Sequence, residues 1–505
     1  MNKRNEYIAA GDNQRIGGVT DNAIQPFKGV PDADIIRIPG IIQLHNGDLF
    51  LSADMRYAAW TEAGGIDTVI TRSTDGGKTW RYSWPIYFPD STDSGKTCAC
   101  TAIDSMCVQG PDGTIYLAAN VSPTGISCVS DPGFINPKTG RSYVCINGVD
   151  RLVLTDSWDK AFTLPAEDDG TVYAYYVGDY ADGYAPVLRR ADGSATDWVV
   201  DDCLNIYTAD HRQLTQEQYS NGEKNGTLCQ QNLLYKDSVL HVFNTQYLWL
   251  ATSKNNGESW SHSLLAHLKK DSERELRHGT GHGITTADGT VVMPGYNCVE
   301  KGGDSAGASV LLLYTKDNGK TWHRSGNEVP LLPDALCYNE CETVELADGT
   351  LRTFLRADGA KFKNMLYADA VWDEGKGNYF FSTPVKLDIE VNLCCKMSAI
   401  AYSRTINGWQ AVLTSYPCAE TSPSRDDGKI FLFLVKENNE MELFHAYDCP
   451  KHYPKPSFGY SNMTELQDGR VAIWYEPTNH IEYIPIEELA PDAVIGDKVQ
   501  IIKKC

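Results

Sequence analysis

Residues 73–80 read STDGGKTW, and related phrases return as SKNNGESW at 253–260 and TKDNGKTW at 315–322. Each copy has turn-forming residues in its middle and a tryptophan at its end. In the first copy, Asp75 can accept hydrogen bonds from the turn that follows it, and Trp80 is large enough to anchor the loop against a sheet. A phrase that occurs three times, once with Asn in place of the Asp, is suited to a repeated fold rather than to a single active site.

A second repeat is a hairpin written around Asn-Gly or Asp-Gly. These dipeptides accept the positive φ angles that tight hairpin turns require, and alternating apolar residues flank them. The five copies are IIQLHNGDLFLSA, MCVQGPDGTIYLAA, GITTADGTVVMPG, TVELADGTLRTFL and MTELQDGRVAIWY, beginning at Ile41, Met106, Gly283, Thr343 and Met463.

Hairpins spread over most of the chain predict one repeating all-β architecture. We expect a six-bladed β-propeller, because radial repetition of small sheets leaves few exposed edges. Between Asn147 and Cys229 the sequence still predicts β-strands but contains neither the octapeptide repeat nor the hairpin repeat. We therefore predict a catalytic propeller at 25–146 and 230–500, interrupted by an inserted β-rich module at 147–229. An extra irregular blade is the alternative for that region.

The net charge of the chain indicates which classes of partner are disfavoured. Its 505 residues include 45 Lys and Arg against 66 Asp and Glu, a formal net charge of −21. This charge disfavours nucleic acid and anionic membranes as partners, and an anionic substrate needs a local cationic pocket. The N-terminal sequence lacks the apolar stretch of a secretion signal, and no later run is long enough to span a membrane. We expect a soluble protein, cytoplasmic as the chain stands or secreted if a signal was removed.

The chain has 15 cysteines, among them the neighbours Cys394 and Cys395 and the pair Cys98 and Cys100. Without a secretion signal they are expected to be reduced thiols rather than a disulfide framework. No Cys-x-x-Cys pair with a matching second pair or histidine points to zinc. We expect no cofactor and no catalytic metal.

The hairpins also predict where functional side chains meet. In an antiparallel hairpin, the residue that enters the first strand and the residue that leaves the second lie at the same end, opposite the turn. If the hairpins are the innermost strands of different blades, these ends converge on one mouth of the propeller axis. The residues at these ends are Glu340 and Arg356, Tyr460 and Glu476, and Arg37 and Asp54, with Arg56 just beyond.

The motifs at these positions resemble one family. They occur in the order RIPG at Arg37, YNECETVEL at Glu340, FLR at Arg356, SRDDG at Arg425 and GYSNMTEL at Tyr460, followed by WYEP at Glu476. In this order, and with octapeptides among them that resemble the Asp boxes of sialidases and other β-propellers, they resemble the retaining exo-α-sialidases built on a six-bladed propeller. The resemblance extends from about Ile36 to Pro485.

The resemblance implies a role for each residue. Three guanidiniums would bind the carboxylate of a sialic acid, since arginine pairs with carboxylates through parallel hydrogen bonds. A tyrosine would be the nucleophile, activated by a glutamate; sialidases are an exception to the two-carboxylate mechanism of most glycosidases. By resemblance the arginines are Arg37, Arg356 and Arg425, the nucleophile is Tyr460, its base is Glu340, and Glu476 orients Arg37.

The general acid is where the sequence departs from the family. The family places an Asp in the loop after the first hairpin, and counting from Arg37 puts Glu62 at that position. Asp67 is the nearest Asp, but it matches a strand residue before the Asp box. The sequence leaves three possibilities for the general acid: Glu62, Asp67, or neither of them. By resemblance, Arg56 and Asp54 would face the C4 and C5 substituents of the sugar, or form an ion pair at the rim.

The leading interpretation is therefore an exo-α-sialidase acting on sialylated glycans or sialosides. One alternative is a propeller glycosidase for a related 2-keto-3-deoxy sugar acid such as Kdn or Kdo. Another is an intramolecular trans-sialidase, because the inserted region resembles the module of bacterial sialidases that include producers of an anhydro sugar. The non-enzyme alternative is a propeller lectin that binds sialic acid. The oligomeric state is left open.

Overall fold

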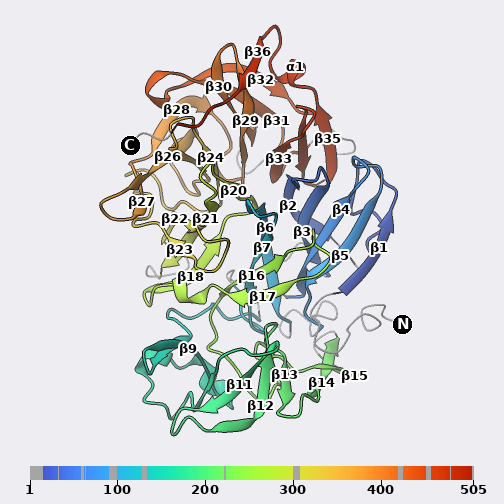
Figure 1. The fold of residues 1–505 in the computed structure, drawn as a ribbon, viewed down its shortest axis with the longest axis vertical. Helices are drawn as coiled ribbons and strands as arrows, with labels where there is room; N and C mark the ends of the chain where they lie inside the picture. The colour runs from blue at the N-terminus through green and yellow to red at the C-terminus, as the bar shows by residue number, and fades with distance from the viewer. Residues whose placement is uncertain are drawn as a thin grey trace.

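A computed structural model describes residues 15–502 except 32, 34, 58–61, 63, 90–98, 128–132, 221–222, 300–306, 419–424, 451–456 and 478. Cys98, one of the predicted reduced thiols, lies outside the described residues. The chain is built almost wholly of β-strands, arranged as curled sheets around a common centre with a separate β-rich part at one side (Figure 1). The predicted all-β six-bladed propeller is confirmed.

The propeller contains six groups of paired strands. The first is β1 (Arg15–Thr20), β2 (Ile35–Gln43), β3 (Leu49–Arg56), β4 (Ile66–Ser73) and β5 (Trp80–Ile86); the second is β6 (Thr101–Gln109), β7 (Ile115–Ser122), β16 (Tyr247–Ser253) and β17 (Ser261–Leu264). The third is β18 (Glu273–His278), β20 (Ile284–Thr285), β21 (Val291–Val299), β22 (Gly307–Thr315) and β23 (His323–Arg324), with β19 (Gly281–His282) beside β6.

The remaining three groups complete the circle. The fourth is β24 (Cys341–Glu345), β25 (Leu351–Leu355), β26 (Asn364–Asp373), β27 (Asn378–Phe381) and β28 (Val385–Glu390). The fifth is β29 (Ser398–Ile406), β30 (Trp409–Pro417), β31 (Gly428–Val435) and β32 (Met441–Asp448), with β36 (Ile495–Lys498) on β29. The one α-helix of the described residues, α1 (Ile486–Leu489), precedes β36 in the chain and contacts β32. The sixth is β33 (Ser461–Glu465), β34 (Val471–Tyr475) and β35 (His480–Ile484).

The five predicted hairpins form as expected. They are β2 with β3, β6 with β7, β20 with β21, β24 with β25, and β33 with β34. The innermost strands of different groups contact one another, as in β2 with β6, β2 with β33, and β29 with both β24 and β33. The hairpins therefore line the axis, which is the arrangement on which the predicted convergence of side chains depends.

The beginning of the described chain closes the ring against its last sheet. Ile481 in β35 donates its backbone N–H to the carbonyl of Ile24. Phe27 stacks on Trp474 of β34 with ring centroids 5.1 Å apart. The first and last blades are thus joined by both a hydrogen bond and aromatic packing.

Strands within residues 143–230 form sheets of their own, and the first of these strands lies before residue 147, where the predicted module begins. One sheet runs in the order β13 (Ile206–Thr208), β12 (Ala195–Asp201), β11 (Tyr184–Arg189), β10 (Tyr175–Val177), β9 (Val149–Leu154) and β8 (Tyr143–Ile146). A two-stranded ribbon, β14 (Thr215–Ser220) with β15 (Glu223–Gln230), follows it. Neither shares a strand with the propeller sheets, and both lie at one side of the propeller, below β16 and β17 in Figure 1.

The octapeptides form turns between outer strands. The Asp75 carboxylate accepts hydrogen bonds from the N–H groups of Lys78 and Thr79, both at 3.0 Å, and from the Thr79 hydroxyl at 2.7 Å. Gly76 adopts φ +75°, which glycine permits. Trp80 is fully buried, so it anchors the turn on the sheet as predicted.

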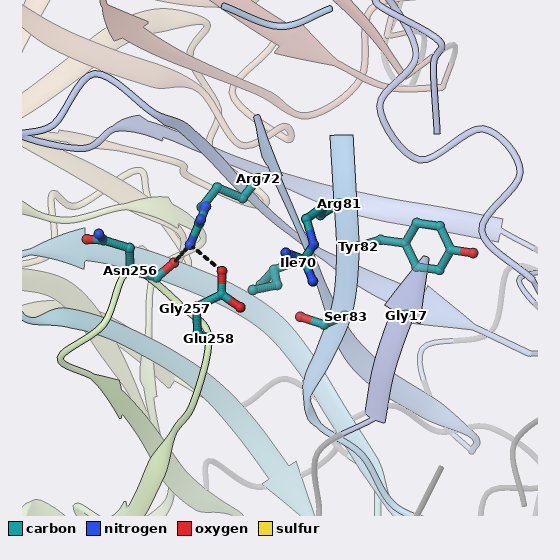
Figure 2. Close-up of a pocket in the computed structure, with 9 residues that line it drawn as sticks. All are labelled: Gly17, Ile70, Arg72, Arg81, Tyr82, Ser83, Asn256, Gly257 and Glu258. Atoms are coloured by element: carbon teal, nitrogen blue, oxygen red, sulfur yellow. Dashed lines mark hydrogen bonds and ion pairs between the residues drawn. The ribbon is translucent and has the colours of Figure 1, made fainter. Parts of the chain in front are cut away.

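The second octapeptide also joins two blades. Arg72 on β4 donates to the carbonyl of Asn256 at 2.5 Å and forms an ion pair with Glu258 at 3.0 Å (Figure 2). A cavity of about 120 Å³ lies at this contact. None of the predicted site residues lines it, so this loop is part of the scaffold.

No helix among the described residues is both long and apolar enough to cross a membrane. The cysteines for which the structure gives a position are free thiols, and most of them are buried.

The Asp boxes predict an acid-dependent loss of stability. Hydrogen bonds from Thr79 lower the pKa of Asp75, and those from Thr321 lower the pKa of Asp317 from 3.8 to about 2. A carboxyl whose pKa is lower in the folded state stabilises the fold above its unfolded pKa, and this contribution is lost as the pH falls through the folded pKa. We expect the Asp75→Asn, Asp317→Asn double variant to lose less Tm than the wild type between about pH 4 and about pH 2.

Melting curves recorded by circular dichroism across this range would check the prediction. The second octapeptide supplies a natural precedent, because the amide oxygen of Asn255 accepts the Ser259 N–H at 2.9 Å. Tm curves that run parallel in the variant and the wild type would contradict it.

Candidate active site

The predicted site residues gather at the open ends of three axial hairpins. At each of these ends, the residue that enters the hairpin pairs through its backbone with the residue that leaves it, as antiparallel geometry predicts. The pairings are Arg37 opposite Asp54, the Arg356 N–H to the Glu340 carbonyl at 3.0 Å, and the Glu476 N–H to the Tyr460 carbonyl at 2.9 Å.

Tyr460 lies at the centre of the group. It precedes β33, only 6% of its surface is exposed, and its hydroxyl donates to Glu340 Oε1 at 2.8 Å. Arg356 Nη1 donates to both Glu340 Oε2 and the Tyr460 oxygen, each at 2.5 Å. Burial raises the pKa of Tyr460, while Arg356 opposes that rise and Glu340 adds to it. A phenol, a carboxylate and a guanidinium are therefore connected in one buried triangle.

Three guanidiniums surround the Tyr460 ring. The guanidinium carbons lie 5.5 Å from the ring centroid for Arg37, 5.8 Å for Arg356 and 5.1 Å for Arg425. Arg425 is held by a hydrogen bond from Nη2 to the carbonyl of Cys394 at 3.0 Å. In a chain of net charge −21, this group of guanidiniums is the local concentration of positive charge that an anionic ligand requires.

Glu476 fixes the orientation of Arg37. Its carboxylate accepts hydrogen bonds from Arg37 Nε at 3.2 Å and Nη2 at 3.0 Å, and from the Ile38 N–H at 2.6 Å. Burial alone would lower the pKa of Arg37, but Glu476 and Glu62 outweigh it and raise that pKa. The guanidinium is thus charged and aligned.

Glu62 lies between two arginines. Its Oε1 accepts hydrogen bonds from Arg37 Nη1 at 2.9 Å and from Arg56 Nη1 at 3.2 Å, and its side chain is 41% exposed. Burial would raise the pKa of Glu62, but Arg56 and Arg37 outweigh it and lower that pKa. Glu62 is therefore an ionised carboxylate that lies beside Arg37 and Arg56 at the edge of this group of guanidiniums.

Asp67 occupies a different environment. It is fully buried in β4, where its carboxylate accepts hydrogen bonds from the Tyr57 hydroxyl at 2.5 Å and the Phe88 N–H at 2.9 Å. The structure brings Glu62 to the arginines and gives Asp67 contacts typical of a structural carboxylate. The role of each in catalysis stays a prediction.

Arg56 and Asp54 form a buried ion pair with a separation of 3.1 Å. Asp54 also accepts the N–H of Asp104 at 2.9 Å, and burial raises the pKa of Asp104 to about 6. Asp104 forms an ion pair with Arg277 at 3.2 Å. Asp104 and Arg277 extend the polar wall, yet the sequence reasoning gave neither a role; the RHGTGHG text around Arg277 was the available signal.

Asp358 is a second residue that the sequence reasoning missed. It accepts a hydrogen bond from Arg356 Nε at 3.1 Å and from Asn339 Nδ2 at 2.7 Å. It therefore fixes the side of Arg356 that faces away from Tyr460. Its position two residues after the FLR arginine was the signal that could have pointed to it.

The site offers no evident set of metal ligands. Among the described residues, one group could hold an ion: Asp201, Asp202 and Cys203, whose ligand atoms lie within 4.8 Å of one another. These residues lie in the inserted region, and the Asp201 carboxylate already accepts hydrogen bonds from the N–H groups of Cys203 and Asn205. Nothing in this group points to a catalytic ion.

Sequence comparison relates the chain to known proteins. A match to the BNR repeat-like domain family covers residues 206–341. The chain is 27% identical to the anhydrosialidase of Macrobdella decora over 481 residues, which is 88% of this chain and 58% of that protein. It is 26% identical to sialidase B of Streptococcus pneumoniae over 497 residues, which is 90% of this chain and 65% of that protein. The chain thus spans about three fifths of the length of these relatives.

Solved structures show the same fold. The leech intramolecular trans-sialidase, determined with 2,7-anhydro-Neu5Ac, aligns with a TM-score of 0.75 and 25% identity over 92% of this chain and 70% of that one. The intramolecular trans-sialidase of Ruminococcus gnavus, determined with oseltamivir carboxylate, aligns with a TM-score of 0.74 and 24% identity over 91% of this chain and 96% of that one.

The fold is a β-propeller like that of the leech intramolecular trans-sialidase. Over about nine tenths of its length the chain is similar to proteins named anhydrosialidase and sialidase B, and part of it matches the BNR repeat-like domain family.

Proposed function

We propose that the protein is a retaining exo-α-sialidase that releases terminal sialic acid from sialylated glycans or sialosides. The observation that carries the proposal is the Tyr460 hydroxyl, which donates to Glu340 at 2.8 Å inside a group of three guanidiniums. A phenol beside a carboxylate base can act as a nucleophile, and the surrounding positive charge suits an anionic sugar.

Substrate recognition follows from charge. The carboxylate on the anomeric carbon of a sialic acid would bind Arg37, Arg356 and Arg425, each of which is held by a carboxylate or a carbonyl. In the free protein Glu62 accepts a hydrogen bond from Arg37 Nη1, so a substrate carboxylate would take its place there. Loss of one cationic partner would raise the pKa of Glu62 towards the range of a general acid.

The covalent step is assigned to Tyr460. Its oxygen would attack the anomeric carbon as its proton passes to Glu340 Oε1, and the glycosidic bond to the leaving oxygen would break. The pKa of Tyr460 is raised by burial, so the free phenol is neutral and needs Glu340 as its base. A neutral nucleophile also avoids the repulsion that a carboxylate nucleophile would meet from the carboxylate of the substrate.

Glu62 is assigned the acid and base role. As an acid it would protonate the leaving oxygen, and as a base it would take a proton from the water that hydrolyses the glycosyl-tyrosine. Two displacements at one carbon give net retention of configuration. Glu62 has the exposure that a proton donor to an outgoing group needs, while Asp67 is fully buried.

An intramolecular trans-sialidase is the second candidate. The leech and Ruminococcus gnavus proteins that align over more than nine tenths of this chain carry that name. In such a reaction a hydroxyl of the bound sugar would replace water as the attacking group, and the product would be an anhydro sugar.

A turnover assay with product analysis tests both candidates. We expect release of the fluorophore from the 4-methylumbelliferyl α-glycoside of N-acetylneuraminic acid, with the sugar appearing first as its α-anomer by proton NMR. An anhydro sugar as the main product would favour the second candidate. Turnover of only the Kdn or Kdo glycoside would reject the preferred substrate, and binding of sialosides without cleavage would indicate a lectin.

A further inference from the structure

The three consecutive residues Cys394, Cys395 and Lys396 lie in the loop before β29, against the site. The Cys394 carbonyl accepts a hydrogen bond from Arg425 at 3.0 Å. Cys395 is fully buried and packs in one apolar cluster with Tyr460 and Ile38. Lys396, also fully buried, donates from Nζ to the carbonyl of Ser461, the residue after Tyr460, at 3.0 Å.

Lys396 also connects the base strand to the nucleophile strand. Its Nζ forms an ion pair with Glu342 Oε1 at 2.5 Å. Glu342 lies two residues after Glu340, so both side chains project from the same face of the strand that begins there. One ammonium group therefore contacts β24, which directly follows Glu340, and β33, which directly follows Tyr460.

The loop reaches the third element of the site as well. The Leu393 carbonyl accepts the N–H of Ala357, the residue after Arg356, at 3.1 Å. Residues 393–396 thus touch the immediate neighbours or the side chains of Arg356, Arg425 and Tyr460.

The Glu342 carboxylate is fully engaged in this network. Oε1 accepts a further hydrogen bond from Asn462 Nδ2 at 2.5 Å, while Oε2 accepts from the Ser398 hydroxyl at 3.0 Å and the Ala399 N–H at 2.9 Å. Since β33 is an edge strand of its sheet, the axis-facing carbonyl of Ser461 has no neighbouring strand to pair with and is satisfied by Lys396.

We infer that the segment 394–396 is a positioning clamp for the nucleophile, in which Lys396 is the principal positioning residue and Cys395 supports the Tyr460 ring. The inference rests on the proposed function. Lys396 does not touch the reacting atoms; it acts by holding the backbone at Ser461 in register with the strand that carries Glu340. The adjacent cysteines noted in the sequence thereby gain a role: one supplies a carbonyl for Arg425 and the other a small buried side chain against Tyr460.

The primary test replaces Lys396 with Met, which has a similar length and no charge. We expect kcat for the N-acetylneuraminic acid glycoside to fall about 10- to 100-fold, because a displacement on the order of an ångström at a nucleophile can cause such a loss. KM should change less than about threefold, since the three arginines remain.

A second variant separates positioning from folding. Lys396→Met leaves Glu342 as a buried unpaired charge, which destabilises the fold. In the Lys396→Met, Glu342→Gln double variant the unpaired charge is gone, so Tm should return towards that of the wild type while kcat stays low. Recovery of kcat together with Tm would show that the network serves folding alone and would overturn the inference.

Two further variants complete the design. Cys395→Ala removes the thiol that packs against Tyr460, and we expect a several-fold lower kcat with an unchanged KM. Arg352→Met, the matched control, breaks a buried ion pair with Asp369 in the same blade as Glu342 and should lower Tm without changing kcat. An equal loss of kcat in this control would also overturn the inference.

The outcomes distinguish the clamp from the function that it serves. An active wild type with unchanged kcat in Lys396→Met would overturn the clamp and leave the proposed function intact. A wild type that turns over no sialoside would overturn the proposed function and the clamp together.

Discussion

Replacing Tyr460 with Phe is expected to reduce kcat for α-sialosides by on the order of a thousandfold or more, because the variant keeps the ring but has no oxygen to form the glycosyl-enzyme. The fold should survive, since Glu340 and Arg356 still pair with each other when the hydroxyl is removed. The measurement is steady-state kinetics alongside Tm from circular dichroism.

A matched control is available one blade away. Tyr416 is fully buried, and its hydroxyl has no hydrogen-bond partner within the part of the chain that the structure describes. Tyr416→Phe should therefore leave kcat unchanged. Near-normal turnover by Tyr460→Phe would remove the nucleophile assignment, whatever the control shows.

Covalent labelling gives a view of Tyr460 that does not depend on turnover. A sialosyl fluoride with a second fluorine beside the anomeric carbon should form a glycosyl-enzyme that hydrolyses slowly. Peptide mass spectrometry is expected to find the sugar on Tyr460. Its attachment to Glu340 or Glu62 would contradict the proposed mechanism.

Glu62→Gln is the second variant for which we expect a large effect. The amide cannot donate a proton to the leaving oxygen, so kcat/KM for an alkyl or sugar leaving group should fall about 100- to 10,000-fold. A 4-nitrophenyl leaving group needs little protonation, and its loss should be far smaller. The ratio of the two losses, measured with both substrates, is the diagnostic quantity.

Asp67→Asn supplies the comparison. Asp67 accepts hydrogen bonds from Tyr57 and Phe88 in a fully buried position, so its replacement should cost about 1–3 kcal/mol of stability. It should alter both substrates equally. A larger loss on the poor leaving group in Asp67→Asn than in Glu62→Gln would transfer the acid role to Asp67.

The parts of the fold that the sequence predicted well are set by local chemistry. An Asn-Gly or Asp-Gly pair specifies a tight turn through its own φ angles, so all five hairpins formed as expected. The meeting of their open ends then followed from the pairing geometry of antiparallel strands, which explains why Arg37, Glu340 and Tyr460 could be placed together without a structure.

The parts that the sequence did not predict depend on contacts between distant elements. Counting residues identified Glu62 as a candidate, but its place between Arg37 and Arg56 is set by the path of a loop, which spacing does not determine. Asp358 and Lys396 were missed because each acts through a partner: Asp358 through Arg356, and Lys396 through Ser461. Lys396 has no local pattern that distinguishes it from a surface charge, and Asp358 has only its position two residues after Arg356.

The pairing of Arg37 with Glu476 has a consequence for synthesis of the chain. The two residues are separated by 439 positions, and the blade that carries Glu476 and Tyr460 is also the one that joins the beginning of the described chain through Ile24. A growing polypeptide on the ribosome therefore holds Arg37 and its near partner Glu62 long before Glu476 and the nucleophile exist. Contacts this distant in sequence form late in folding. Catalytic competence is accordingly expected to arise in one step, when the ring closes, with no partly active fragment before it.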